Sequence, residues 1–230
     1  YIFIILTGCA STCMEFRSAT TAARSEKNLK RAEEWGLKAL ESSECNPTSN
    51  AHVPYFLATE VYLKQKKYIK MAEMLNISEE INPDQSLEIP FKLGDKPVHT
   101  IGEGVMAYRD QEWAKIFNNA VELIKKEKIN DAKKKINLAI LIHPQKVENY
   151  TTLAAIHIQN KNMEMALATA DRGLGADNEN SMLYQLKADI LLQNNPDLSK
   201  MQSAKELYLL SIKYSDDPGP IMRKLLFVYI

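Results

Sequence analysis

The sequence predicts an all-α fold, a solenoid of antiparallel helix pairs. Three alanines that lie 34 residues apart, Ala120, Ala154 and Ala188, each fall inside an amphipathic, helix-like segment. Ala132 and Ala166 repeat the same 34-residue step. Self-similarity at this period is typical of helical solenoids, in which each helix pair buries its apolar face against the next pair. A solenoid presents an extended surface to other molecules, so binding is the expected function.

The overall composition agrees with a folded helical protein. The 230 residues are 45% hydrophobic and 25% charged, and 29 basic residues balance 29 acidic ones. Eight glycines and nine prolines are too few for a β-sandwich with many tight turns. A net charge of zero argues against a protein that coats nucleic acid, because such proteins carry strongly basic surfaces. No nucleic-acid partner is expected.

Five successive units share a pattern of large and small residues. A large residue comes early in the first helix and a small one follows four residues later. Two small residues then lie seven apart in the second helix, and a proline often ends the unit. The pattern is clearest in the third unit (Ile116, Ala120, Ala132, Ala139, Pro144), the fourth (Tyr150, Ala154, Ala166, Gly173, Asn178) and the fifth (Tyr184, Ala188, Ala204, Ser211, Asp216). The second unit follows the pattern more loosely (Tyr55, Thr59, Met71, Ser78, Pro83). In the first unit only the second helix follows it (Ala32, Ala39, Pro47).

This unit resembles the tetratricopeptide repeat family. The resemblance implies a right-handed superhelical solenoid whose concave side is lined by the first helix of each pair. The small residues have a physical reason, because a side chain larger than alanine or glycine would push apart two helices that cross closely. A proline after the second helix cannot continue that helix, so it sets the turn into the next unit.

Helix-breaking residues gather between the second and third units. They are Pro90, Gly94 and Pro97. Residues 85–99 are therefore expected to form an irregular linker. Residues 9–84 then hold about two repeats, and residues 100–230 hold about three more and the start of another. Apolar residues recur at near-helical spacing across Thr100–Lys126, which predicts one long amphipathic helix there.

The first residues resemble the end of a bacterial lipoprotein signal peptide. Tyr1–Leu6 is a run of large apolar residues that is too short to span a membrane. Leu6-Thr7-Gly8-Cys9 is similar to the lipobox, at which cleavage before the cysteine leaves that cysteine lipidated. The resemblance implies that residues 1–8 are a signal-peptide remnant and that Cys9 anchors the chain to a membrane. With Ala10 next in sequence, the expected location is the periplasmic side of a bacterial outer membrane.

The cysteines and the chain ends carry two further expectations. Cys9, Cys13 and Cys45 form no CxxC pair and no zinc spacing with histidine, so neither a disulfide-stapled fold nor a metal site is expected. Whether Cys13 and Cys45 are free thiols stays open. Because the chain begins with Tyr1 and ends on the uncapped apolar stretch Ile221–Ile230, we expect a fragment of a longer gene product.

The face of each first helix that points away from its partner helix is expected to line a concave groove. By the family resemblance this face holds Phe56, Glu60, Lys64, Phe117, Val121, Lys125, Thr151, Gln159, Gln185 and Asp189. The first half of this set is apolar and basic, and the second half is neutral with one acid. Such a groove suits a peptide with an apolar anchor and an acidic end. The alternative is that these are ordinary solvated helix positions.

Residues for chemistry are not expected. The four histidines, His52, His99, His143 and His157, have no metal-ligand spacing, and His157 falls at a packing position. The sequence has no HExxH, GxGxxG, P-loop or GxSxG motif. A clamp for a C-terminal carboxylate is not expected either, since the family's asparagine is replaced in each first helix. Neither an enzymatic activity, a cofactor nor a small-molecule substrate is expected.

The expected function is a non-enzymatic scaffold for protein–protein contacts, anchored by lipid on Cys9 and binding a partner peptide or protein in its groove. One alternative is a cytoplasmic adaptor or chaperone-like regulatory module without a lipid. Another is a structural subunit that docks through Ile221–Ile230. Lipid on Cys9 distinguishes the first reading from the second.

Overall fold

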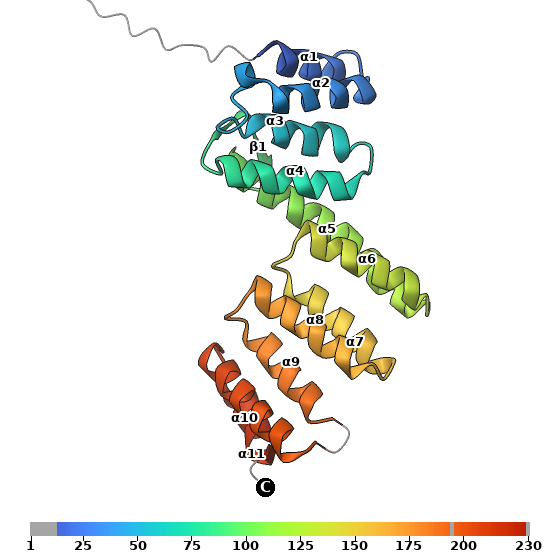
Figure 1. Ribbon diagram of the computed structural model, residues 1–230, viewed down its shortest axis with the longest axis vertical. Coiled ribbons are helices and arrows are strands. Elements are labelled where there is room, and N and C mark those ends of the chain that lie inside the picture. Colours follow the sequence, from blue (N-terminus) through green and yellow to red (C-terminus); the bar gives the residue numbers. More distant parts are fainter. Residues whose placement is uncertain (1–12, 194–195, 229–230) are drawn as a thin grey trace, which may run out of the picture. The chain divides into compact units, whose positions relative to one another are not determined.

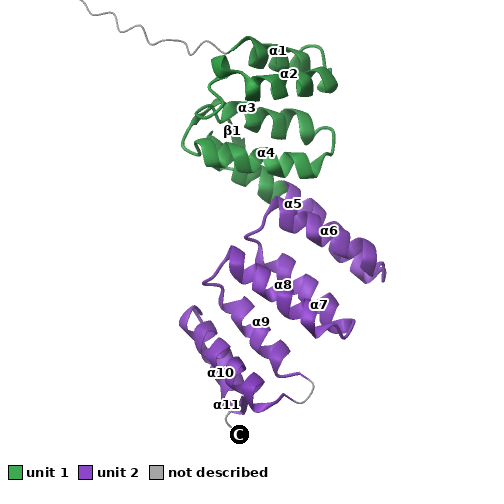
Figure 2. Cartoon of the chain, viewed as in Figure 1, with its two compact units in different colours: residues 1–111 green, residues 112–230 purple. Residues whose placement is uncertain are grey.

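The computed structural model describes residues 13–193 and 196–228. The chain divides into two compact units, up to Gln111 and from Glu112, and the division falls inside a helix (Figure 2). The sequence placed this division in a linker at residues 85–99, which instead belong to the N-terminal unit. None of the described helices is long and apolar enough to cross a membrane.

The N-terminal unit is built from two helix pairs and a hairpin (Figure 1). Its helical elements are α1 (Met14–Arg24), α2 (Leu29–Glu41), the short η1 (Ser43–Cys45), α3 (His52–Phe56), the π-helical continuation η2 (Leu57–Tyr62) and α4 (Tyr68–Ile81). The first pair is α1 with α2, and the second is α3 and η2 with α4. Helix α2 begins where the Asn28 side chain accepts a hydrogen bond from the backbone of Arg31, the usual role of asparagine at a helix start.

The turn between the two helices of a pair recurs along the chain. In four pairs the residue two positions before the second helix has a positive φ. These residues are Lys27, Lys66, Glu127 and Lys161, with φ between 54° and 58°. A left-handed residue after the first helix lets the chain reverse within three to five residues. The same short turn thus repeats because the same helix pair repeats.

Residues 85–99 are not an irregular linker. Strand β1 (Ser86–Leu93) pairs antiparallel with β2 (Lys96–Thr100), and Leu93 faces Lys96 across a two-residue turn. Gly94 takes the left-handed conformation that this turn requires, with φ 61°. The prolines do not prevent the hairpin, because both strands of a two-stranded ribbon are edge strands. One of them, Pro90, lies where the pairing register shifts between Ser86 and Phe91.

The long helix expected over Thr100–Lys126 is confirmed as α5 (Ile101–Lys125), which runs from the hairpin into the C-terminal unit. The remaining elements are α6 (Ile129–Ile142), α7 (Val147–Gln159), α8 (Met163–Ala176), α9 (Ser181–Leu191), α10 (Leu198–Lys213) and α11 (Gly219–Val228). Helices α7 and α8 form one pair and α9 and α10 the next, while α11 packs against α10. This arrangement confirms the predicted all-α fold of helix pairs.

The small residues of the repeat pattern lie where the sequence analysis placed them, at close helix contacts. Ala120, Ala132, Ala139, Ala154, Ala166, Ala188 and Ala204 are fully buried. In α8, a Cβ added to Gly173 would lie 2.8 Å from Leu183 and 3.0 Å from Tyr150, closer than side chains normally pack. The predicted packing role of His157 is likewise confirmed, since its side chain is buried in α7.

Candidate functional site

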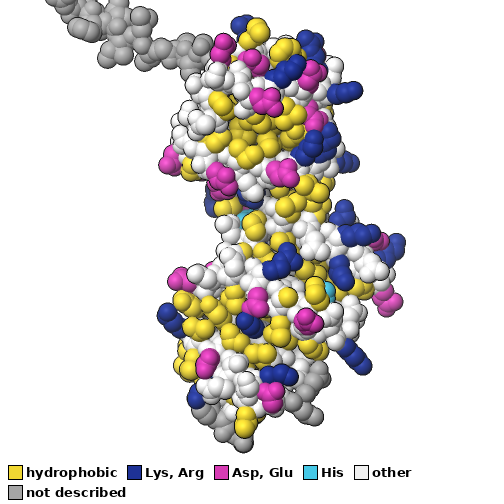
Figure 3. Space-filling view, viewed as in Figure 1, with side chains coloured by type: hydrophobic (Ala, Val, Ile, Leu, Met, Phe, Trp, Pro, Cys, Tyr) yellow, Lys and Arg dark blue, Asp and Glu magenta, His cyan; other side chains and the backbone are white. Residues whose placement is uncertain are grey.

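A pocket of about 330 Å³ opens in the N-terminal unit. Five aromatic side chains line it and come from four different elements: Phe16 of α1, Tyr55 and Phe56 of α3, Phe91 of β1 and Tyr108 of α5. Two of the predicted groove residues, Phe56 and Glu60, are among its lining residues. On the face seen in Figure 3, hydrophobic side chains gather in the middle of the N-terminal unit and charged ones surround them.

The aromatic rings support one another. Phe16 and Phe56 meet edge to face with ring centres 5.5 Å apart, and Tyr55 meets Tyr108 in the same way at 6.1 Å. Phe91 reaches over from the hairpin, with its ring centre 6.0 Å from that of Tyr108. Edge-to-face contacts of this kind fix ring orientation and leave other ring faces available to a ligand. The pocket wall is thus held in place by its own aromatic contacts.

The π-helical segment η2 contributes two further residues to the lining of the pocket. The helix that starts at His52 widens into a π-helical turn over Leu57–Tyr62, where the Leu63 amide donates to the Ala58 carbonyl at 2.9 Å. A wider turn changes which side chains share a face, and such turns are frequent at functional sites. Thr59 and Glu60 lie in this turn and line the pocket with Phe56.

Tyr55 is set deeply into this wall. Its hydroxyl lies against Gly104 of α5, where any side chain would collide with it. Burial, with smaller contributions from Tyr108 and Glu60, raises the pKa of Tyr55, so its hydroxyl stays protonated. Within the described part of the chain this buried hydroxyl has no hydrogen-bond partner. Gly104 therefore makes room for a ring that builds the pocket floor.

Charged groups line one side of the pocket. The Arg24 guanidinium lies 6.0 Å from the ring centre of Phe56, and its Nε is 3.8 Å from Oε1 of Glu60. The other oxygen of Glu60 accepts a hydrogen bond from Lys64 Nζ at 2.7 Å. The third predicted groove residue of this unit, Lys64, lies in the turn after η2, is not among the lining residues of the pocket, and shares Glu60 with Arg24. These half-exposed pairs position the side chains and contribute little to stability.

A histidine and a carboxylate, His52 and Glu88, also line the pocket. Burial lowers the pKa of His52, and the nearby negative charge of Glu88 opposes that shift only in part. The His52 imidazole is therefore uncharged near neutral pH. Glu88 is exposed on β1 and makes no salt bridge within the described residues. This side of the pocket carries an unneutralised negative charge.

None of the predicted groove positions of the third and fourth units is among the residues that line this pocket. Phe117 stacks on Trp113 with ring centres 5.2 Å apart, and Val121 is half-buried. Lys125 is exposed and pairs with Glu122 one helical turn back. Thr151 donates its hydroxyl to the Val147 carbonyl at 3.3 Å, and Gln159 is exposed.

The two positions of the fifth unit have different surroundings. Gln185 lines a pocket of about 520 Å³ between the start of α9 and the turn before α11. Asp189 instead holds helices together, because Oδ1 accepts a hydrogen bond from Tyr208 at 2.6 Å and Oδ2 pairs with Lys224 at 2.6 Å. Its carboxylate is already bound by α10 and α11.

Only two of the twelve lining residues of the pocket, Phe56 and Glu60, are among the groove positions predicted from the sequence. Leu87, Glu88, Ile89 and Phe91 line it from β1, and Phe16 and Tyr108 from helices whose groove faces were not assigned. A signal was present, since polar and apolar residues alternate over Ser86–Leu93 and the next residue is a glycine. That combination is typical of a strand entering a hairpin, and the helix-breaking prolines concealed it.

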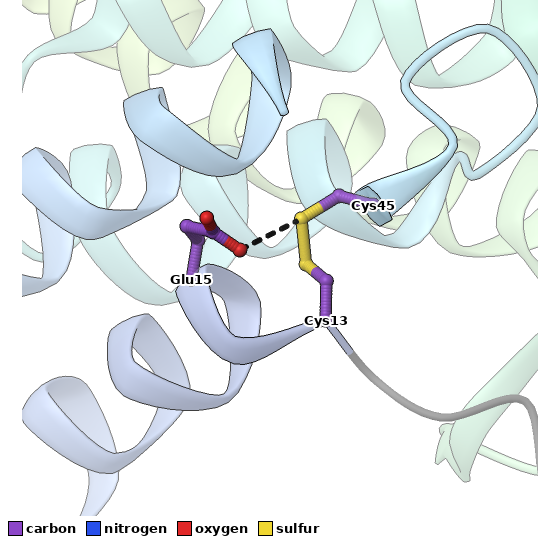
Figure 4. A group of neighbouring side chains, drawn as sticks. All are labelled: Cys13, Glu15 and Cys45. Carbon is purple, nitrogen blue, oxygen red and sulfur yellow. Dashed lines mark hydrogen bonds between the residues drawn. A yellow bond between two sulfur atoms is a disulfide. The ribbon is translucent and has the colours of Figure 1, made fainter. Parts of the chain in front are cut away.

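Cys13 and Cys45 form a disulfide, which corrects the expectation that no disulfide staples the fold (Figure 4). Their Cα atoms lie 4.9 Å apart, within the range for such bonds. The carboxylate of Glu15 lies 3.6 Å from Sγ of Cys45. These three residues have metal-ligand spacing, but bonded sulfurs are not the thiolates that bind metals. The predicted lipid site, Cys9, lies outside the described residues.

Among known proteins, the chain is similar to several solved structures at low sequence identity. No family model and no curated protein matches the chain. It is similar, at 14% identity, to the TPR2AB domain of yeast Sti1 in a complex with pHSP90 (94% of this chain, 95% of that one, TM-score 0.43). It is also similar to PilF of Pseudomonas aeruginosa, at 14% identity, with 94% of this chain and 82% of that one covered and a TM-score of 0.40.

A third similar structure is the Yersinia enterocolitica type III secretion chaperone SycD in complex with a peptide of the translocator YopD. It shares 14% identity and covers 52% of this chain and 88% of that one, with a TM-score of 0.42. In this chain, helix pairs recur at a 34-residue period, and small residues are buried where the helices cross. On those features the chain has the all-α fold of tetratricopeptide-repeat proteins.

Proposed function

We propose that this chain is a non-enzymatic scaffold that binds a peptide segment of a partner protein in the aromatic pocket of the N-terminal unit. The observation that carries the proposal is the convergence of five aromatic side chains from α1, α3, β1 and α5 on one open pocket. Aromatic pockets of this kind receive the large apolar side chains that dominate binding energy at protein interfaces.

The accessible wall of the pocket offers a test that does not disturb the core. Ile89 lines the pocket from β1, yet its side chain is 67% exposed, so Ile89→Asp is compatible with folding. Leu198→Asp is the matched control, because Leu198 is 84% exposed at the start of α10 and does not line this pocket. Peptides are selected from a random library on the wild-type chain, and their affinities are measured by fluorescence anisotropy.

Selected peptides are expected to contain a large apolar residue and to lose about tenfold or more in affinity for Ile89→Asp, the scale of losing a buried anchor. Their affinity for Leu198→Asp is expected to stay that of the wild type. Peptides that bind both variants equally well, or a library from which nothing is enriched, would show that the pocket is not a peptide site.

We further propose that Cys9 carries a lipid that holds this scaffold at the periplasmic face of a bacterial outer membrane. The disulfide supports this location, because such bonds persist in oxidising compartments and are rare in the cytosol. The alternative is a cytoplasmic adaptor without lipid. Intact-mass analysis and membrane fractionation of the full gene product, beside Cys9→Ala, decide between them. A lipid-sized mass and membrane sedimentation that the variant lacks support the anchor, and two unmodified soluble proteins exclude it.

A further inference from the structure

Two further hollows adjoin the aromatic pocket. A hollow of about 400 Å³ shares Phe16, His52 and Glu88 with it. A hollow of about 490 Å³ shares Arg24 with it. All three belong to the N-terminal unit. Because each outer hollow shares lining residues with the central pocket and none with the other hollow, we take the three together as one trough with two distinct ends.

One end of the trough is acidic, and we call it the acidic end. Glu44 and Glu88 line it together with neutral polar residues and the disulfide, and no lysine or arginine is among its lining residues. Both carboxylates are exposed, and neither forms a salt bridge with another described residue. The lowered pKa of His52 keeps that imidazole from supplying a compensating charge near neutral pH.

The other end is basic, and we call it the basic end. Its charged lining residues are Arg24, Lys27 and Lys64, and no acidic side chain lines this hollow. Arg24 and Lys64 share the carboxylate of Glu60, which leaves an excess of positive charge among the three cations and one anion. Lys27 is exposed and has no salt bridge within the part of the chain that the structure describes.

We infer that the partner of this trough is an extended peptide with a fixed order of side chains: a basic residue, then a large apolar anchor, then an acidic residue. The basic residue lies at the acidic end, the anchor among the aromatic rings and the acidic residue at the basic end. This inference rests on the proposed function and adds the charge of the ligand to it. Exposed charges of this kind select the partner and its direction more than they add affinity.

The test uses charge reversal at each end with a matched control for each. Lys27→Glu reverses the basic end and Glu88→Lys the acidic end. The controls are Lys30→Glu on α2 and Glu80→Lys on α4, which change net charge equally at exposed positions outside the three hollows. The peptides are those selected on the wild-type chain, and anisotropy is measured at low and high salt.

Lys27→Glu and Glu88→Lys are each expected to weaken binding by about threefold to tenfold, since attraction at an exposed pair becomes repulsion. Replacing the peptide's acidic residues with lysine is expected to restore its binding to Lys27→Glu. The two controls are expected to bind as the wild type does, and salt is expected to shrink all these differences.

Three results would contradict the inference in different ways. If binding requires Ile89 but Lys27→Glu and Glu88→Lys leave it within about twofold, the charge order is wrong and the peptide pocket stands. If the controls weaken binding as much as the reversals do, only net charge matters, and the inference again fails. If binding does not require Ile89 at all, the proposed function fails and the charge order fails with it.

Discussion

A disulfide joins Cys13, the residue before α1, to Cys45, in the short helical turn after α2. The two cysteines are separated by 32 positions in sequence, and their Cα atoms lie 4.9 Å apart. The bond therefore ties both ends of the first helix pair together. Both cysteines also line the acidic end of the trough beside Glu44, so the bond positions one part of the candidate site.

Removing this disulfide should destabilise the chain without changing its fold. For a loop of this length, Cys13→Ser with Cys45→Ser is expected to lower the free energy of unfolding by about 3–4 kcal/mol, because the unfolded chain regains conformational freedom. Urea unfolding of the wild type with and without reductant measures the effect. Reductant should leave the double variant unchanged, and equal stability of the oxidised wild type and the variant would refute the prediction.

Two glycines of α8 should respond in opposite ways to the same substitution. Gly173→Ala is expected to cost about 1–3 kcal/mol of stability, because its methyl group would press against Leu183 and Tyr150. Gly175 has no neighbouring atom within 4 Å of an added Cβ, so Gly175→Ala should stabilise the helix by about 0.5–1 kcal/mol. Thermal unfolding of the two variants checks both signs. A Gly173→Ala protein as stable as Gly175→Ala would contradict the packing argument.

Stability should fall as the pH drops below the ordinary pKa of histidine. Burial, with a smaller contribution from Lys133, lowers the pKa of His157 below its usual value near 6.5. Below that value the unfolded chain takes up a proton that the folded chain does not, so acid favours unfolding until the folded pKa is reached. Urea unfolding between about pH 7.5 and about pH 5.5 covers this window while carboxylates stay ionised. His157→Gln should reduce the dependence and leave the part that His52, whose pKa is also lowered, contributes. An unchanged slope would exclude His157 as a source.

Asp189 should matter for stability rather than for ligand binding. Asp189→Ala removes the acceptor of the Tyr208 hydroxyl and the partner of Lys224, with an expected cost of about 1–2 kcal/mol. Asp189→Asn keeps an acceptor for Tyr208 and should lose less. Asp171→Ala is the control, because the Asp171 side chain is more exposed than that of Asp189 (53% against 33%) and its pair with Lys187 should cost under about 1 kcal/mol to break. Chemical denaturation ranks the three variants, and equal losses for Asp189→Ala and Asp171→Ala would contradict this role.

The candidate site could be predicted from the sequence only where local helix periodicity determines it. Phe56 and Glu60 follow from the position of a small residue in the first helix of a pair, and both line the pocket. Asp189 follows from the same rule, but its carboxylate is held by Tyr208 and Lys224 from later helices. Periodicity predicts which face of a helix a side chain lies on. The helices packed against that face decide whether the side chain is available to a ligand.

The sequence by itself determined the helix pairs. Alanines such as Ala120 and Ala154 recur at 34 residues because every close helix crossing imposes the same steric limit, and that limit is local to each unit. Only the tertiary structure decided the hairpin's place in the pocket wall, the meeting of Phe91 with Tyr108, and the pairing of Cys13 with Cys45. These contacts join residues far apart in sequence, and their formation depends on distances in space that no local pattern encodes.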